Sequence, residues 1–87
     1  MGFRWIEWNI KKVEEHRVLP VEAERVVLTA RRPYPKYGRD GTWLVWGRGR
    51  GGRPVQAVFV LDEDGEVFII HARPLTRAEV KRFRKQE

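Results

Sequence analysis

The most constraining feature of this sequence is a strand and a helix that meet at a proline between Glu66 and Phe83. The unbroken β-favouring run Val67–Ile70 predicts a strand that is covered on at least one side. Pro74 cannot donate to a sheet ladder and disfavours helix at the residue before it, so the strand should end there. Thr76 and Glu79 then form the capping-box pattern T-x-x-E, which fixes where the following helix begins.

Strict alternation along this strand predicts two distinct faces. One face should carry Val67, Ile69, His71 and Arg73, and the other Phe68, Ile70 and Ala72. His71 and Arg73 would then project side by side next to the start of the helix, which makes this joint the first place to look for functional groups.

The rest of the chain predicts two helices followed by a meander of strands. The expected elements are a short edge strand at Phe3–Trp8, a helix capped by Asn9 that runs to about His16, a second helix from Pro20, a loop from Arg31 to Thr42, and strands at Trp43–Arg48, Val55–Leu61 and Glu66–Arg73. The end of the second helix stays open, because Val26–Ala30 is also β-prone. This order indicates a single α+β domain over residues 1–87, with N-terminal helices packed on a small antiparallel sheet of three to four strands and a C-terminal helix.

Composition narrows the possible functions. The chain has no cysteine and two histidines, and no carboxylate lies at ligand spacing from either histidine, so we expect no metal and no cofactor. No apolar run approaches the roughly 20 residues of a membrane span, which predicts a cytoplasmic protein without membrane contact. A domain this short is marginal by itself, so a partner or an oligomer stays open.

Positive charge is gathered in two segments of a chain whose net charge is +6. Asp40 alone opposes seven basic side chains in the first segment, 31–53, and Glu79 alone opposes six in the second, 73–85. Such segregation indicates a polyanionic partner, most simply RNA, although a solvated basic surface is the alternative. The residues expected to contact nucleic acid are Arg50, Arg53, Lys36, Arg39, Tyr37, Arg77 and Lys81.

His71 is the side chain best suited to general acid–base chemistry near neutral pH. Arg73 lies on the same predicted face, and Arg48 would join them if their strands are neighbours. This combination can cleave a phosphodiester, because the imidazole moves protons while the guanidiniums hold the phosphate. RNA supplies its own 2′-hydroxyl as nucleophile, so no metal is required. The alternative is that His71 only packs at the end of its strand.

The sequence also resembles the BrnT family, the toxin half of a bacterial type II toxin–antitoxin system. The likeness runs through Trp8-Asn9, His16-Arg17-Val18, Trp46-Gly47-Arg48, Gly52-Arg53, and Val67–Arg73 followed by Thr76, Glu79 and Phe83, which is similar to the family ending I-I-x-A-R-x-x-T-x-x-E. The resemblance implies a RelE-like fold, a metal-independent endoribonuclease that inhibits translation, and a cognate antitoxin that neutralises it. Arg48, Arg73 and the Thr76–Glu79 helix start match the family by position.

The chain departs from this family at two places. Arg17 stands where the family usually has glycine, and the segment before Trp43 is short and basic where many members have an acidic stretch that contains a strand. Two other function classes therefore stay open. One is a nucleic-acid-binding module without catalysis, and the other is a structural protein whose basic face docks an acidic partner.

Overall fold

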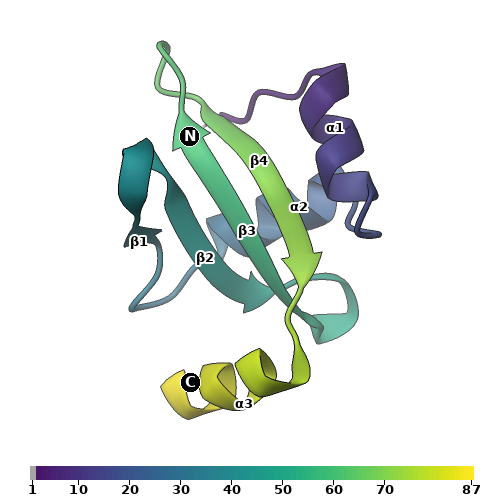
Figure 1. Cartoon of the computed structure of the whole chain (residues 1–87), viewed down its shortest axis with the longest axis vertical. Coiled ribbons are helices and arrows are strands. Elements are labelled where there is room, and N and C mark those ends of the chain that lie inside the picture. The colour runs from purple at the N-terminus through teal and green to yellow at the C-terminus, as the bar shows by residue number, and fades with distance from the viewer. Residues whose placement is uncertain (1) are drawn as a thin grey trace.

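The computed structural model describes residues 2–87 and shows an α+β fold built on a four-stranded antiparallel sheet (Figure 1). The helices are α1 (Glu7–Glu14), α2 (Pro20–Leu28) and α3 (Arg77–Gln86), and the strands are β1 (Lys36–Tyr37), β2 (Trp43–Arg48), β3 (Pro54–Leu61) and β4 (Val67–Pro74). The strands are ordered β1-β2-β3-β4, so each neighbour in the sequence is also a neighbour in space. The predicted class, N-terminal helix pair and C-terminal helix are confirmed.

One face of the sheet is the core and is covered by α1 and α2 (Figure 1). Val45, Ala57 and Ala72 form a fully buried row across β2, β3 and β4 on this face. A Cβ placed on Gly47 would lie 3.2 Å from Val26, a tight contact, so α2 sits directly on β2 and glycine relieves the crowding at that position. Close packing of this kind holds the helix layer at a fixed distance from the sheet.

The opposite face carries α3 at one end of the sheet (Figure 1). The cross-strand row on this face is Trp46, Gln56 and Arg73. Phe83 is the only buried residue of α3, and its ring packs perpendicular to that of Trp46 with 6.3 Å between the centroids. A single aromatic anchor therefore seats this helix, and polar contacts must hold its two ends.

The N-terminal segment differs from the edge strand predicted at Phe3–Trp8. Only Phe3 forms a bridge, parallel to Val67, and α1 takes up the end of the segment. Asn9, predicted as an N-cap, lies inside the first turn, where its Oδ1 accepts a hydrogen bond from the N–H of Ile6 at 2.7 Å. The Asn9 side chain is fully buried, and this position within the turn satisfies its amide.

Tertiary contacts decide two segments that the sequence left open. Val26–Ala30 is helical through Leu28, because Ala23, Val26 and Val27 are buried at helical spacing. The predicted loop 31–42 contains the two-residue strand β1, which pairs only with Trp43 and Leu44. The sheet thus has four strands, and the remainder of β2 forms an open edge.

A β-bulge in β4 overturns the predicted division of its faces. Phe59 pairs with Ile69 and Val58 pairs with His71, which leaves Ile70 as an extra residue. Beyond the bulge the alternation is reversed, so Ala72 takes the core position. His71 and Arg73 still share a face, as predicted, but it is the face opposite Val67 and Ile69.

The turn after α1 has a left-handed residue at Arg17. Arg17 has a φ of 62°, and the N–H of Val18 donates to the carbonyl of Val13 at 3.2 Å. This is the left-handed helix ending at which glycine is strongly favoured. We expect Arg17→Gly to raise the free energy of unfolding by about 0.5–1 kcal/mol, since glycine has no Cβ to strain.

Urea unfolding of Arg17→Gly beside Arg17→Ala tests this expectation. The alanine variant loses the same charge and keeps the Cβ, so it should gain nothing. Equal stabilities of the two variants would show that the left-handed turn is not strained by a side chain.

Candidate nucleic-acid interface

A cleft of about 600 Å³ opens between the end of α2, the loop that follows it, β2 and the end of α3. It lies along the open edge of β2, next to the residues that β1 does not pair. The cleft is lined by Arg25, Thr29, Arg31, Arg32, Tyr34, Trp46, Gly47, Arg48, Phe83, Gln86 and Glu87. Three segments far apart in the sequence thus meet at one hollow.

The charge of this cleft is strongly positive. Four arginines line it, and Glu87 is the only carboxylate among the lining residues. Within residues 2–87, no carboxylate forms an ion pair with Arg25, Arg31 or Arg32. Arginines that line a concave surface without carboxylate partners give it a positive potential that favours an anion with several charges.

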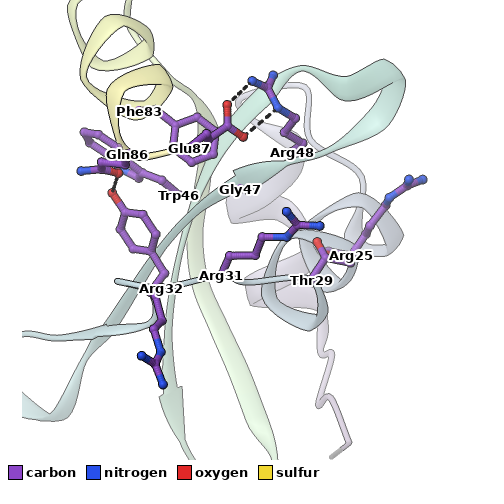
Figure 2. A pocket seen from close by; sticks show the side chains of 11 residues that line it. Arg25, Thr29, Arg31, Arg32, Trp46, Gly47, Arg48, Phe83, Gln86 and Glu87 are labelled. Atoms are coloured by element: carbon purple, nitrogen blue, oxygen red, sulfur yellow. Dashed lines mark hydrogen bonds and ion pairs between the residues drawn. The ribbon is translucent and has the colours of Figure 1, made fainter.

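Arg48 is the one cleft arginine that has a carboxylate partner. Its Nε and Nη2 donate to the two oxygens of Glu87, at 3.1 and 2.5 Å, and its Nη1 donates to the carbonyl of Gly52 at 2.9 Å. Figure 2 shows this pair at one end of the cleft, with Arg31 and Arg25 on the α2 side and Arg32 turned away. The fork geometry is the one with which arginine also holds phosphate.

An aromatic cluster forms the floor of the cleft. Trp46, Phe83 and Tyr34 lie with their ring centroids 6.0–6.5 Å apart, and all three are buried. The hydroxyl of Tyr34 donates to Gln86 at 2.7 Å, which ties the loop to α3. Tyr34 therefore pins its loop to α3.

Arg73, predicted to hold a phosphate, holds Glu79 instead. Its Nη1 and Nη2 donate to the two carboxylate oxygens at 2.8 and 2.9 Å. Glu79 also completes the predicted capping box, since it accepts from the N–H of Thr76 at 2.8 Å and its own N–H donates to Thr76 Oγ1. The hydrogen bond from Arg73 is the main reason that the pKa of Glu79 falls to about 2.

The three predicted catalytic residues share one face of the sheet but do not form one site. Arg73 contacts Glu79 at the start of α3, whereas Arg48 contacts Glu87 just past its end. Eight residues of helix separate the two carboxylates, about 12 Å. The two arginines thus clamp opposite ends of α3.

His71 lies beside His16, a contact that was not predicted from the sequence. The centroid of its ring is 5.2 Å from that of His16, and the two planes meet at 66°. Burial is the largest effect on the pKa of His71 and lowers it, and the positive charges of His16 and Arg73 lower it further. The ring of His71 is therefore neutral near pH 7 and able to accept a proton.

The predicted nucleic-acid contacts lie in several places. Arg50, Arg39, Arg77 and Lys81 are exposed, and Lys36 lies over the ring of Tyr34 with 5.4 Å to its centroid. Tyr37 is 66% exposed, so its ring can stack on an unpaired base. Arg53 differs from the others, because it forms a two-pronged ion pair with the buried Glu22.

Five residues of interest were missed by reasoning from the sequence. Arg31 and Arg32 had been counted only as part of a basic segment, although an adjacent pair in a proline-rich loop is itself a signal. Arg25 and Thr29 are four residues apart, which places both on one face of a helix. His16 had been considered only as a metal ligand, and no local pattern links it to β4.

Two further classes of site were checked in the described chain. Among residues 2–87, no group of three histidine, cysteine, aspartate or glutamate side chains could hold a metal ion. None of the helices in that range is long and apolar enough to cross a membrane.

Comparisons of the chain with protein-family models, curated proteins and solved structures give no match. The functional inference therefore rests on the residues of this chain and their geometry.

Proposed function

We propose that this protein binds single-stranded RNA in the basic cleft and cleaves it as a metal-independent endoribonuclease toxin of the RelE-like BrnT type. The single observation that carries the binding half is that Arg25, Arg31 and Arg32 line one hollow beside Arg48 without a carboxylate partner among residues 2–87. Sequence-independent binding of a single strand needs such a positively charged groove to follow the backbone. The cleft is the size of a small-molecule pocket, so it suits one strand rather than a duplex.

The cleavage half rests on different support. The resemblance to the BrnT family implies ribonuclease activity, arrest of translation and a cognate antitoxin, and His71 offers a neutral imidazole for proton transfer. We expect production of the protein in bacteria to stop growth. Co-production of a small DNA-binding partner encoded next to its gene should restore growth.

Binding is tested with a fluorescent single-stranded RNA oligonucleotide over a range of salt concentrations. We expect Arg25→Ala/Arg31→Ala to weaken binding by about 10–100-fold and to flatten the salt dependence, because two phosphate contacts are lost. The matched control is Lys11→Ala/Lys85→Ala, which removes the same charge from exposed positions outside the cleft lining. Equal losses in both double variants would mean that net charge alone attracts RNA and would sink the cleft assignment.

Glu87→Gln is expected to change RNA affinity in the opposite direction in the same experiment. Its carboxylate occupies the fork of Arg48 that a phosphate would otherwise use. Removing this charge should tighten RNA binding by several-fold. An unchanged affinity would place the RNA away from Arg48.

A nucleic-acid-binding module without catalysis is the second candidate. The observation that favours it is that Arg48 and Arg73, both expected at a scissile phosphate, are engaged by Glu87 and Glu79. Incubation of the bound RNA with a chelator present separates the two candidates. Cleavage products support the ribonuclease, and intact RNA with full affinity supports the module. Absence of binding at moderate salt would support the third class, a protein that docks an acidic partner.

A further inference from the structure

The imidazole rings of His16 and His71 lie next to each other, and both rings are at least partly exposed to solvent. His16 is exposed at the end of α1, and His71 is half-buried on β4. Within residues 2–87, no hydrogen bond from another group engages the ring nitrogens of either histidine. Their nitrogens are therefore free to bind a ligand, unlike the guanidiniums of Arg73 and Arg53.

Two irregular backbone features place these rings together. The bulge at Ile70 puts His71 on the face opposite Ile69, and His16 lies just past the end of α1, next to the left-handed turn at Arg17. Bulges often redirect a side chain beside an active site.

The groups around His71 favour the neutral form of its ring, and most of the charged groups among them are basic. His16 and Glu15 act on it from the end of α1, Arg73 acts from its own strand, and β3 contributes only the apolar partner Val58. Burial, His16 and Arg73 lower the pKa of His71, and Glu15 opposes them. A base with this environment accepts a proton without a metal ion.

We propose that His71 is the general base and His16 the general acid of a ribonuclease site, an inference that rests on the proposed function. His71 takes the proton of a ribose 2′-hydroxyl while that oxygen attacks the adjacent phosphorus. His16 gives a proton to the 5′-oxygen of the next nucleotide as its bond to phosphorus breaks. The products are a 2′,3′-cyclic phosphate and a 5′-hydroxyl, and water later returns the two histidines to their starting protonation states.

The turn between β2 and β3, with Arg48, Arg50 and Arg53, lies between this pair and the cleft and forms a basic ridge. The carbonyl of Arg17 accepts from Arg53 Nη2 at 2.6 Å, so the turn between β2 and β3 touches the end of α1. The same turn touches the cleft, because the carbonyl of Gly52 accepts from Arg48 at 2.9 Å. Arg50 is exposed on the turn between them. An RNA strand held in the cleft can follow this ridge to the histidines.

The test uses the full chain and an RNA oligonucleotide, with binding and cleavage measured on the same samples. We expect His16→Asn and His71→Asn each to slow cleavage by about 10²–10⁴-fold while binding changes less than about twofold. His71→Gln serves as a second variant of the half-buried position, and Glu14→Gln is the matched control on the exposed end of α1. Circular dichroism verifies that each variant is folded.

Two readouts separate catalysis from a structural effect. The cleavage rate should fall as the pH is lowered, and His71→Asn should remove this acidic limb of the pH–rate profile. An oligonucleotide with a 2′-deoxy sugar at the cleaved position should bind and stay intact. Products with 3′-hydroxyl and 5′-phosphate ends, or unchanged rates in both variants, would overturn the pair. RNA that binds the cleft but is never cleaved would also overturn it, and cleft binding would stand.

Discussion

We expect Glu22→Ala to lower the free energy of unfolding by about 2–3 kcal/mol, a large share of the stability of a domain of this size. The carboxylate of Glu22 is 3% exposed and accepts from Arg53 Nε and Nη2 at 2.7 Å each, and from the N–H of Arg50 at 2.8 Å. The hydrogen bond from Arg53 holds the pKa of Glu22 below its usual range. Removing the carboxylate of Glu22 leaves the guanidinium of Arg53 and the backbone N–H of Arg50 without their hydrogen-bond acceptor.

The same contact positions the basic ridge. Glu22 ties the turn Arg50–Gly52 to α2, and Gly52 in turn accepts from Arg48 in the cleft. Glu22→Ala should therefore also loosen the link between the cleft and the histidines.

Urea unfolding measures the stability, and a double variant gives the control. Glu22→Leu/Arg53→Leu removes both charges and should cost less than the sum of the two single changes, because no unpaired ion remains. Strict additivity would contradict a coupled pair.

We also expect the protein to lose stability in acid through Glu79. Its pKa is about 2 in the folded chain, against an ordinary value of 4.5. The contribution is complete above about pH 5 and is lost as the pH falls toward 2, because the unfolded chain then binds the proton first. The shift corresponds to at most about 3 kcal/mol, and solvent screening of the Arg73–Glu79 pair reduces it.

Glu79→Gln is the matched variant for this effect. Glutamine can still accept the hydrogen bond of the capping box but carries no charge for Arg73. Thermal unfolding should show the variant less stable than the parent chain at pH 7 and equal to it near pH 2. A difference that stays constant with pH would show that the ion pair adds nothing.

His71 contributes a second and separate pH effect. Because its pKa is lowered in the fold, protonation favours the unfolded chain, and the loss begins as the pH falls below the ordinary value of 6.5. In His71→Asn, the loss of stability caused by His71 at the higher pH should disappear, and the loss caused by Glu79 at lower pH should remain. The two windows thus distinguish the histidine from the carboxylate.

Local sequence signals were sufficient for much of the chain. The T-x-x-E cap and the strand runs each act within a few residues, so α3 and the antiparallel strands β3 and β4 were predicted correctly. The start of α1 was not, because buried Asn9 is satisfied by contacts that only the folded N-terminus provides.

For the candidate sites too, local sequence patterns predicted some features and tertiary packing decided the others. Charge segregation by itself predicted a polyanionic partner, which stays a prediction, and His71 and Arg73 were correctly placed on one face of a strand. The cleft, the His16–His71 contact and the pairing of Arg48 and Arg73 with opposite ends of α3 depend on residues far apart in the chain. Caps, turns and alternation are local and can be read from neighbouring residues. Which carboxylate reaches which arginine, and which histidine meets which, is decided only when the helices pack on the sheet.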